Sequence, residues 1–162
     1  MPSIIKFTNL LSLNTLMKKE VVKEITDTNF QSRRYMLHLS EKDAVQIIES
    51  RNRTLNDTGR LELNHDIINK IIMTFCTSPY INQYDYTETI CDLMAVFYYY
   101  KNETSDEIGD DDLIDYMKER FDGNCYGSLE LLVNRELENL VVEIRKKQRW
   151  TSMPGDGPED EV

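Results

Sequence analysis

Apolar side chains in the middle of the chain recur at the spacing of an α-helix, and this spacing constrains the fold more than any other feature. Between Asn64 and the helix-ending Ser78-Pro79, isoleucine and phenylalanine fall at positions i, i+3, i+4 and i+7. Similar stripes run through five further segments: 12–28, 40–59, 86–101, 110–123, and one that starts at Ser128 or Asn134 and ends at Trp150. Glycine and proline in the body of the chain lie between these segments. The pattern therefore predicts an all-α protein.

The expected fold is a compact all-α bundle of five or six helices, with room for one short ribbon. A polar stretch at 29–34 is expected to end the first helix, and 35–39 and 60–63 then read as short extended segments that can pair as two strands. We expect residues 1–150 to form a single helical domain. Residues 151–162 have no apolar period and carry four acids, which predicts a disordered acidic tail.

Residues with strong positional preferences mark several helix ends. Ser40 is the expected N-cap of the second helix, with Asp43 near the amides of the first turn. Asp110 is expected to cap the fifth helix, and Gly123 suits its C-terminal end. These residues predict where the apolar stripes begin and stop.

Charge and cysteine content limit the partners and the compartment. The chain has 162 residues and a net charge of −10, so it repels nucleic acid and anionic lipid, and we expect it to bind neither nucleic acid nor membranes. The longest apolar run, residues 93–100, is too short to span a bilayer, and the N-terminus does not read as a signal peptide. Three widely spaced cysteines predict free thiols in a reducing cytoplasm: Cys76, Cys91 and Cys125.

Two windows resemble the calcium loop of an EF-hand, and both are incomplete. Residues 122–133 have Asp122 and Gly127 at the first and sixth positions, and residues 54–65 have Gly59 at the sixth. The twelfth position, which supplies a bidentate glutamate in EF-hands, holds Val133 or His65. With so few anionic ligands, a calcium ion gains too little to offset its dehydration. We therefore expect no metal and no cofactor, and we interpret the windows as helix junctions whose glycines adopt positive φ.

Catalytic motifs are missing, and three residues remain as candidates for binding. The chain has no G-x-S-x-G and no Gly-rich phosphate loop, which favours a protein without catalytic activity and assigns no catalytic residue. Arg51 and Asn52 lie on the apolar stripe of the second helix, where an arginine must be paired or must line a cleft. Tyr99 lies on the side of its helix that carries acids, so it should reach the surface and suits a protein contact.

These features support three functional hypotheses. The first is a protein-interaction or scaffold module whose partner is another protein, with its oligomeric state left open. The second is an enzyme or small-ligand binder with a pocket near Arg51. The third is a degenerate EF-hand-like calcium module.

Four separated segments also resemble a known family: 49–60, 75–82, 97–104 and 121–132. Together they are similar to the family of small bacterial proteins catalogued as domain of unknown function 6323, and the likeness extends over residues 30–148. The resemblance implies a cytoplasmic bacterial protein. It implies no activity, cofactor or catalytic residue.

Overall fold

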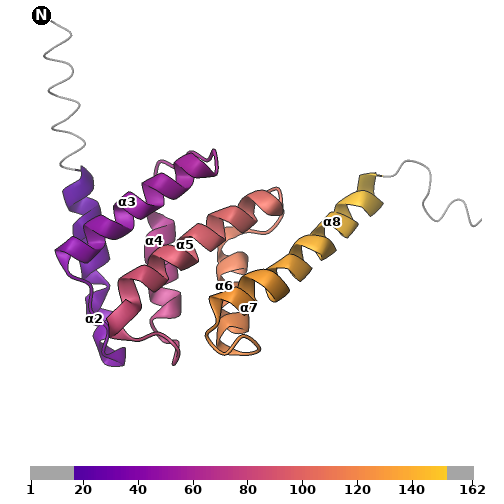
Figure 1. Cartoon of the computed structure of the whole chain (residues 1–162). Coiled ribbons are helices and arrows are strands. Elements are labelled where there is room, and N and C mark those ends of the chain that lie inside the picture. The colour runs from indigo at the N-terminus through magenta and orange to yellow at the C-terminus, as the bar shows by residue number, and fades with distance from the viewer. Residues whose placement is uncertain (1–16, 153–162) are drawn as a thin grey trace, which may run out of the picture. The chain divides into compact units, whose positions relative to one another are not determined.

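The regular structure of the protein is helical throughout the part that the computed structural model describes, residues 17–152 (Figure 1). Six helices of ten residues or more make up most of it: residues 17–27, α3 (Glu41–Asp57), α4 (Asp66–Phe75), α5 (Tyr86–Glu103), α6 (Asp110–Asp122) and α8 (Glu138–Ser152). Shorter segments connect them: α2 (Asn29–Ser32), η1 (Arg33–Tyr35), η2 (Gln83–Asp85), α7 (Leu129–Leu131) and the π-helical η3 (Leu132–Leu137). Residues 17–152 contain no strand. The predicted all-α class is confirmed.

The chain divides into two compact units, Met1–Ala95 and Val96–Val162. The boundary falls within α5, so the first unit contains the helix at 17–27, α3, α4 and the start of α5, and the second contains the rest. A single domain over residues 1–150 remains a prediction. Residues 12–16 of the first expected helix, and residues 153–162 of the expected acidic tail, lie outside the described residues.

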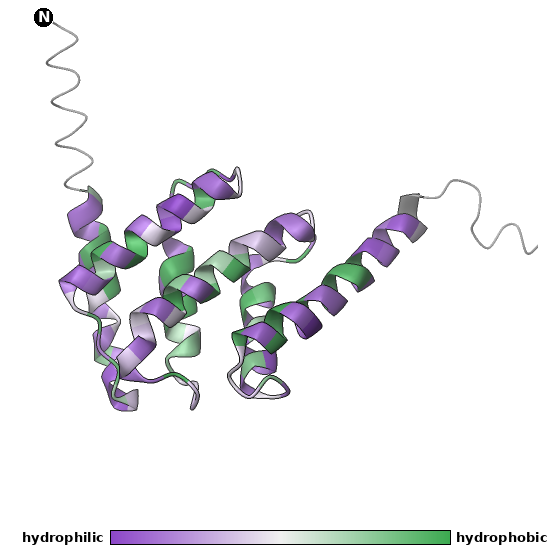
Figure 2. Cartoon of the chain, in the orientation of Figure 1, coloured by the Kyte–Doolittle hydropathy of each residue, from purple (hydrophilic) through white to green (hydrophobic). Residues whose placement is uncertain are grey.

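The clearest of the predicted apolar stripes, that of α4, is buried. In α4 the five stripe residues Ile67, Ile68, Ile71, Ile72 and Phe75 are at most 3% exposed. Figure 2 shows hydrophobic and hydrophilic residues sharing single helices, as expected for helices with one buried side. Phe97 of α5 is also fully buried. Burial of these side chains is the main favourable contribution to folding.

Helix α3 begins with the capping box that the sequence predicts. The Asp43 amide donates to Ser40 Oγ at 3.0 Å, and the Ser40 amide donates to Asp43 Oδ2 at 2.9 Å. Two amides that the helix leaves without partners are therefore satisfied. This cap fixes where α3 starts and thus which of its residues reach the core.

Replacing Ser40 by alanine should lower the free energy of unfolding by about 1 kcal/mol, because the Asp43 amide loses its acceptor. Chemical denaturation followed by circular dichroism measures the change. Lys42→Ala, an exposed change in the same turn, is the control and should stay within about 0.5 kcal/mol of wild type. A Ser40→Ala variant as stable as this control would contradict the capping assignment.

The expected ribbon is absent from residues 17–152, because side chains occupy the backbone groups that a ribbon would use. Asn29 Nδ2 donates to the Leu39 carbonyl and Asn29 Oδ1 accepts from the Leu39 amide, each at 2.7 Å. The Gln83 side chain binds the His38 amide at 2.7 Å and the His38 carbonyl at 3.0 Å. Arg51 donates hydrogen bonds to the carbonyls of residues 62 and 64. The backbone groups of residues 38 and 39 and the carbonyl of residue 62 are thus bound to side chains.

One expected helix boundary is confirmed and one needs correction. The first helix ends at residue 27, as expected, and after a turn at Thr28 the polar stretch 29–34 forms α2 and the first part of η1. Its polar side chains satisfy backbone groups, as Asn29 does. The N-cap of α6 is Gly109, and Asp110 is its first helical residue. Gly123 is the C-cap of α6, as predicted.

The last helix starts at Ser128, whose Oγ accepts from the Leu131 amide at 3.2 Å. It then passes through the π-helical turn η3, which shifts the backbone pairing by one residue. Two tyrosines supply hydrogen bonds to carbonyls of this turn. The Tyr100 hydroxyl lies within hydrogen-bond distance of two acceptors, the Val133 carbonyl at 3.2 Å and Glu138 Oε2 at 3.1 Å, and the Tyr116 hydroxyl donates to the Glu136 carbonyl at 3.2 Å.

Candidate functional site

The central residue of the candidate site is Arg51, which is buried on the core side of α3 with an exposed fraction of 4%. Its Nη2 donates to the carbonyl of Glu62 at 3.0 Å and to the carbonyl of Asn64 at 2.6 Å. Its Nη1 donates to Asn52 Oδ1 at 2.9 Å. Hydrogen bonds from a charged donor are the stronger kind, and their strength rises away from water. Arg51 therefore ties the segment 60–65 to α3.

The segment 60–65 is fixed at its ends as well as in its middle. Gly59, with φ of 68°, allows the sharp turn after α3, and the Arg60 amide donates to the Leu55 carbonyl at 2.8 Å. At the other end, Asn64 Oδ1 accepts from the Asp66 amide at 3.2 Å, where α4 begins. We call this the clamped segment (residues 60–65).

The clamped segment exposes two large aliphatic side chains. Leu61 is 87% exposed and Leu63 is 86% exposed. They alternate with Glu62 and Asn64, whose carbonyls Arg51 holds. Single exposed leucines are common, but two on one tethered segment form a local apolar contact surface. This exposure differs from the expectation that residues 60–63 can pair as a strand.

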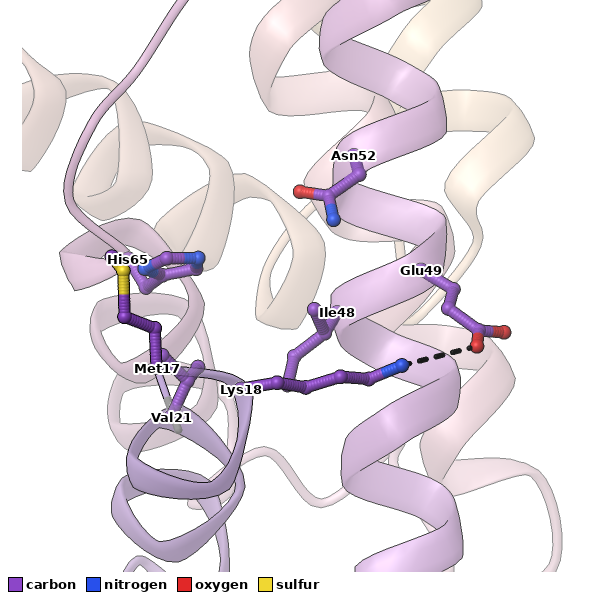
Figure 3. Close-up of a pocket in the computed structure, with 7 residues that line it drawn as sticks. All are labelled: Met17, Lys18, Val21, Ile48, Glu49, Asn52 and His65. Atoms are coloured by element: carbon purple, nitrogen blue, oxygen red, sulfur yellow. Dashed lines mark ion pairs between the residues drawn. The ribbon is translucent and has the colours of Figure 1, made fainter. Parts of the chain in front are cut away.

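A cavity of about 330 Å³ lies next to the clamped segment, in the first unit. It is lined by residues of the helix at 17–27, of α3 and of the α4 N-cap: Met17, Lys18, Val21, Ile48, Glu49, Asn52 and His65. Figure 3 shows Lys18 reaching across to Glu49 on α3, and these side chains form an ion pair at 3.5 Å. The predicted binding residue Asn52 lines this cavity, and the predicted residue Arg51, which does not line it, donates a hydrogen bond to Asn52.

His65 contributes an uncharged imidazole to this cavity. Partial burial lowers the pKa of His65, and the positive charge of Arg51 lowers it further, although Glu24 and Asp66 act in the opposite direction. The ring is therefore neutral at pH 7, with one nitrogen that donates and one that accepts. In the sequence, His65 stands out only as the residue at the twelfth position of a calcium-like window.

Tyr99, the third predicted binding residue, belongs to the second unit. It is half exposed, as its helix position predicts, and its ring meets Tyr100 edge-on with centroids 5.0 Å apart. A hydrogen bond to the Glu103 carboxylate, together with the negative charge of that group, raises the pKa of the Tyr99 hydroxyl. Whether Tyr99 binds a partner stays a prediction.

In the second unit, as in the first, a buried cationic side chain binds the backbone of a loop. Lys101 of α5 is 5% exposed, and its Nζ donates to the Ile108 carbonyl at 2.8 Å. The same ammonium pairs with Asp110 at 2.8 Å and with Asp106 at 3.6 Å. Ser105 and Asp106 adopt positive φ in this loop, which costs energy without glycine. A buried cation thus fixes a strained loop here.

The two calcium-like windows use their polar groups internally. In the first, Asp122 forms an ion pair with Lys118, and the Asn124 carbonyl accepts from Arg135 at 2.7 Å. In the second, the Arg51 guanidinium holds the carbonyls of 62 and 64. In both windows an arginine therefore binds backbone carbonyls of the loop. Residues 17–152 contain no group of three or more His, Cys, Asp or Glu side chains placed to hold a metal.

Gly59 and Gly127 adopt φ of 68° and 78°, so both junction glycines have the positive φ that the sequence predicts. All three cysteines are free thiols. Every helix in the described part of the chain is too short or too polar to span a bilayer.

The fold and the site define a small helical protein that carries an arginine-clamped segment and a neighbouring cavity. A family model, described as a family of unknown function (DUF6323), matches residues 24–150. The chain belongs to this family, which confirms the resemblance found in the sequence. No curated protein and no solved structure matches the chain.

Proposed function

We propose that this protein is an interaction module that presents Leu61 and Leu63 to a partner protein. The observation that carries the proposal is the exposure of both leucines, 87% and 86%, on a segment that buried Arg51 tethers. Burying a leucine side chain contributes about 1.5–3 kcal/mol, so the pair can contribute much of the affinity of a small interface.

The hydrogen bonds from Arg51 should increase the affinity that the two leucines provide, because they order the clamped segment before a partner binds. A segment that is already ordered loses little conformational entropy when a partner binds, so more of the contact energy appears as affinity. Arg51 makes two hydrogen bonds to the backbone of the segment, and a third hydrogen bond to Asn52 on α3. Burying the charged guanidinium of Arg51 costs desolvation energy. This cost favours a functional role for the segment that Arg51 holds.

The charge of the chain favours a basic partner. With a net charge of −10, the protein attracts a positively charged surface over a distance of about one Debye length. We therefore propose a partner with an aliphatic pocket surrounded by lysine or arginine. Three free thiols support a reducing cytoplasm as the place of this encounter.

The double variant Leu61→Ser/Leu63→Ser tests the proposal. Wild-type protein immobilised as the full chain should retain a specific partner from native lysate, and the variant should lose it. With the purified partner, the Kd should rise by about 100-fold or more, because both leucines lose their apolar burial. Raising the salt concentration should weaken the wild-type complex if the partner is basic.

Tyr84→Ser is the matched control, because Tyr84 is 98% exposed in the same unit but lies outside the clamped segment. It should retain the partner with the wild-type Kd. Equal retention by the leucine variant, or no specific partner for the wild type, would overturn the proposal. So would light scattering that shows a homodimer which the leucine substitutions dissociate, since the occupant would then be a second copy.

A further inference from the structure

A short turn in the first unit exposes three large apolar side chains together with two arginines. Phe30 on α2 is 59% exposed, Tyr35 at the end of η1 is 47% exposed, and Met36 directly after it is 86% exposed. Arg33 and Arg34 lie between them and are exposed as well. The guanidinium carbon of Arg33 lies 4.7 Å from the centre of the Phe30 ring, which is a cation–π contact. We call residues 30–36 the aromatic turn.

Hydrogen bonds hold the aromatic turn in one conformation. The Met36 amide donates to the Arg33 carbonyl at 3.0 Å, and the Leu37 amide donates to the Ser32 carbonyl at 3.2 Å. The hydroxyl of buried Ser32 donates in return to the Leu37 carbonyl at 3.1 Å. Leu37 is itself buried, so it anchors the end of the turn in the core. A partner that binds the exposed side chains therefore meets an ordered surface and loses little affinity to ordering it.

Met36 has a strained backbone although its side chain contributes little to the core. Its φ of 61° and ψ of 33° lie in the left-handed region, which favours glycine. The side chain that maintains this strain is largely exposed, so burial within the first unit does not explain its presence. Strained residues of this kind concentrate at functional sites. Strain and exposure together point to a contact between Met36 and another molecule.

The charge of the aromatic turn is opposite to that of the chain. The chain has 29 Asp and Glu residues among 162, but residues 28–40 contain none, and Arg33 and Arg34 make this stretch positive. Arginine pairs well with carboxylates, and aromatic residues, methionine and arginine are enriched in protein interfaces. Nucleic acid and anionic membranes carry charge over distances longer than the turn, so they would also meet the net negative charge of the rest of the chain. A short acidic segment of a protein contacts the turn alone.

We infer that the aromatic turn docks an acidic segment of a partner protein that carries at least one large apolar side chain. The carboxylates of this segment pair with Arg33 and Arg34, and its apolar side chain packs against Tyr35 and Met36. The inference is independent of the proposed function, because the aromatic turn and the clamped segment share no residue and favour partners of opposite charge.

Selection of random peptides displayed on phage against the immobilised full chain tests the inference. We expect the enriched peptides to combine a net negative charge with an aromatic or aliphatic residue. Fluorescence polarisation with synthetic copies of these peptides then measures their Kd. The variant Leu61→Ser/Leu63→Ser should bind them with the wild-type Kd, so failure of this inference is distinguishable from failure of the proposed function. No enrichment, or enrichment of neutral or basic peptides, would overturn the inference.

Met36→Gly separates binding from folding. Glycine accepts the positive φ, so the midpoint of thermal unfolding should stay within about 3 °C of wild type. The Kd for the acidic peptides should nevertheless rise by about 10-fold or more, because the exposed side chain is gone. Met73→Ala, which truncates a partly exposed methionine on α4 in the same unit, is the control and should leave the Kd unchanged. An unchanged Kd for Met36→Gly would contradict the assignment.

Reversing the charge of the turn tests the nature of the occupant. Arg33→Glu/Arg34→Glu should abolish binding of the acidic peptides, whereas Arg53→Glu, an exposed change on α3, should leave it intact. Polyuridylate and phosphatidylserine vesicles are the comparison probes, and neither should bind the wild type. Binding of either probe that the arginine substitutions abolish would overturn the inference in favour of a polyanion. A homodimer that Met36→Gly dissociates would overturn it as well, since the occupant would then be a second copy.

Discussion

Replacing Arg51 by methionine is expected to lower the free energy of unfolding by about 3 kcal/mol. Methionine has a similar length and fills the buried position, but the carbonyls of Glu62 and Asn64 lose their charged donor. Hydrogen bonds to charged groups contribute about 1.5–3 kcal/mol each, and water can replace part of this in a loop. Urea denaturation followed by circular dichroism measures the loss.

Arg53→Met is the matched control for this prediction. Arg53 is exposed, lies two residues further along the same helix and makes no hydrogen bond to the clamped segment. Its replacement should change the free energy of unfolding by no more than about 0.5 kcal/mol. Equal effects of the two substitutions would mean that Arg51 does not tether the segment.

Truncating Ile71 to alanine should lower the free energy of unfolding by about 3 kcal/mol. Ile71 is fully buried at the centre of the α4 stripe, and alanine leaves a cavity that the surrounding side chains fill only in part. Thermal and urea denaturation should both show the loss. A second variant, Ile71→Val, removes one methyl group and should cost about 1 kcal/mol.

Met73→Ala provides the comparison within α4. Met73 is 40% exposed on the other side of the helix, so its truncation should change the free energy of unfolding by less than about 1 kcal/mol. If Ile71→Ala were as mild as Met73→Ala, the stripe would not be the buried side of α4. The assignment of the core from helical spacing would then be wrong.

Helical spacing predicts most of this fold because burial of one side is a property of the local sequence. The α4 stripe, the capping box at Ser40 and the C-cap at Gly123 all follow from residues within a few positions of one another. Such signals need no knowledge of the rest of the chain. They also place Tyr99 correctly at the surface.

The missed features depend on contacts between residues far apart in the sequence. Residues 35–39 look like a strand in the sequence, but Gln83, 45 residues from His38, binds both backbone groups of His38. The π-helical turn η3 is similar, since Tyr100 reaches one of its carbonyls from 33 residues away. No periodicity in a single sequence reports such partners.

The candidate site was predictable only in part. The position of Arg51 on an apolar stripe indicates that it must be paired or line a cleft, and it does bind the backbone of a neighbouring segment. The leucines that it presents alternate with polar residues, as in a half-buried strand, so the pattern alone suggests burial where the structure shows exposure. The signal that could have revealed them is the buried arginine itself, which needs carbonyl partners nearby.

Backbone ¹⁵N relaxation at Leu61 and Leu63 tests most directly whether Arg51 holds these residues in place for a partner. We predict order parameters near 0.85 for both amides in the wild type, as in a rigid helix, and values below about 0.6 in Arg51→Met. Order parameters below about 0.6 in the wild type would show that the segment is not held, and would contradict the account of a pre-ordered contact.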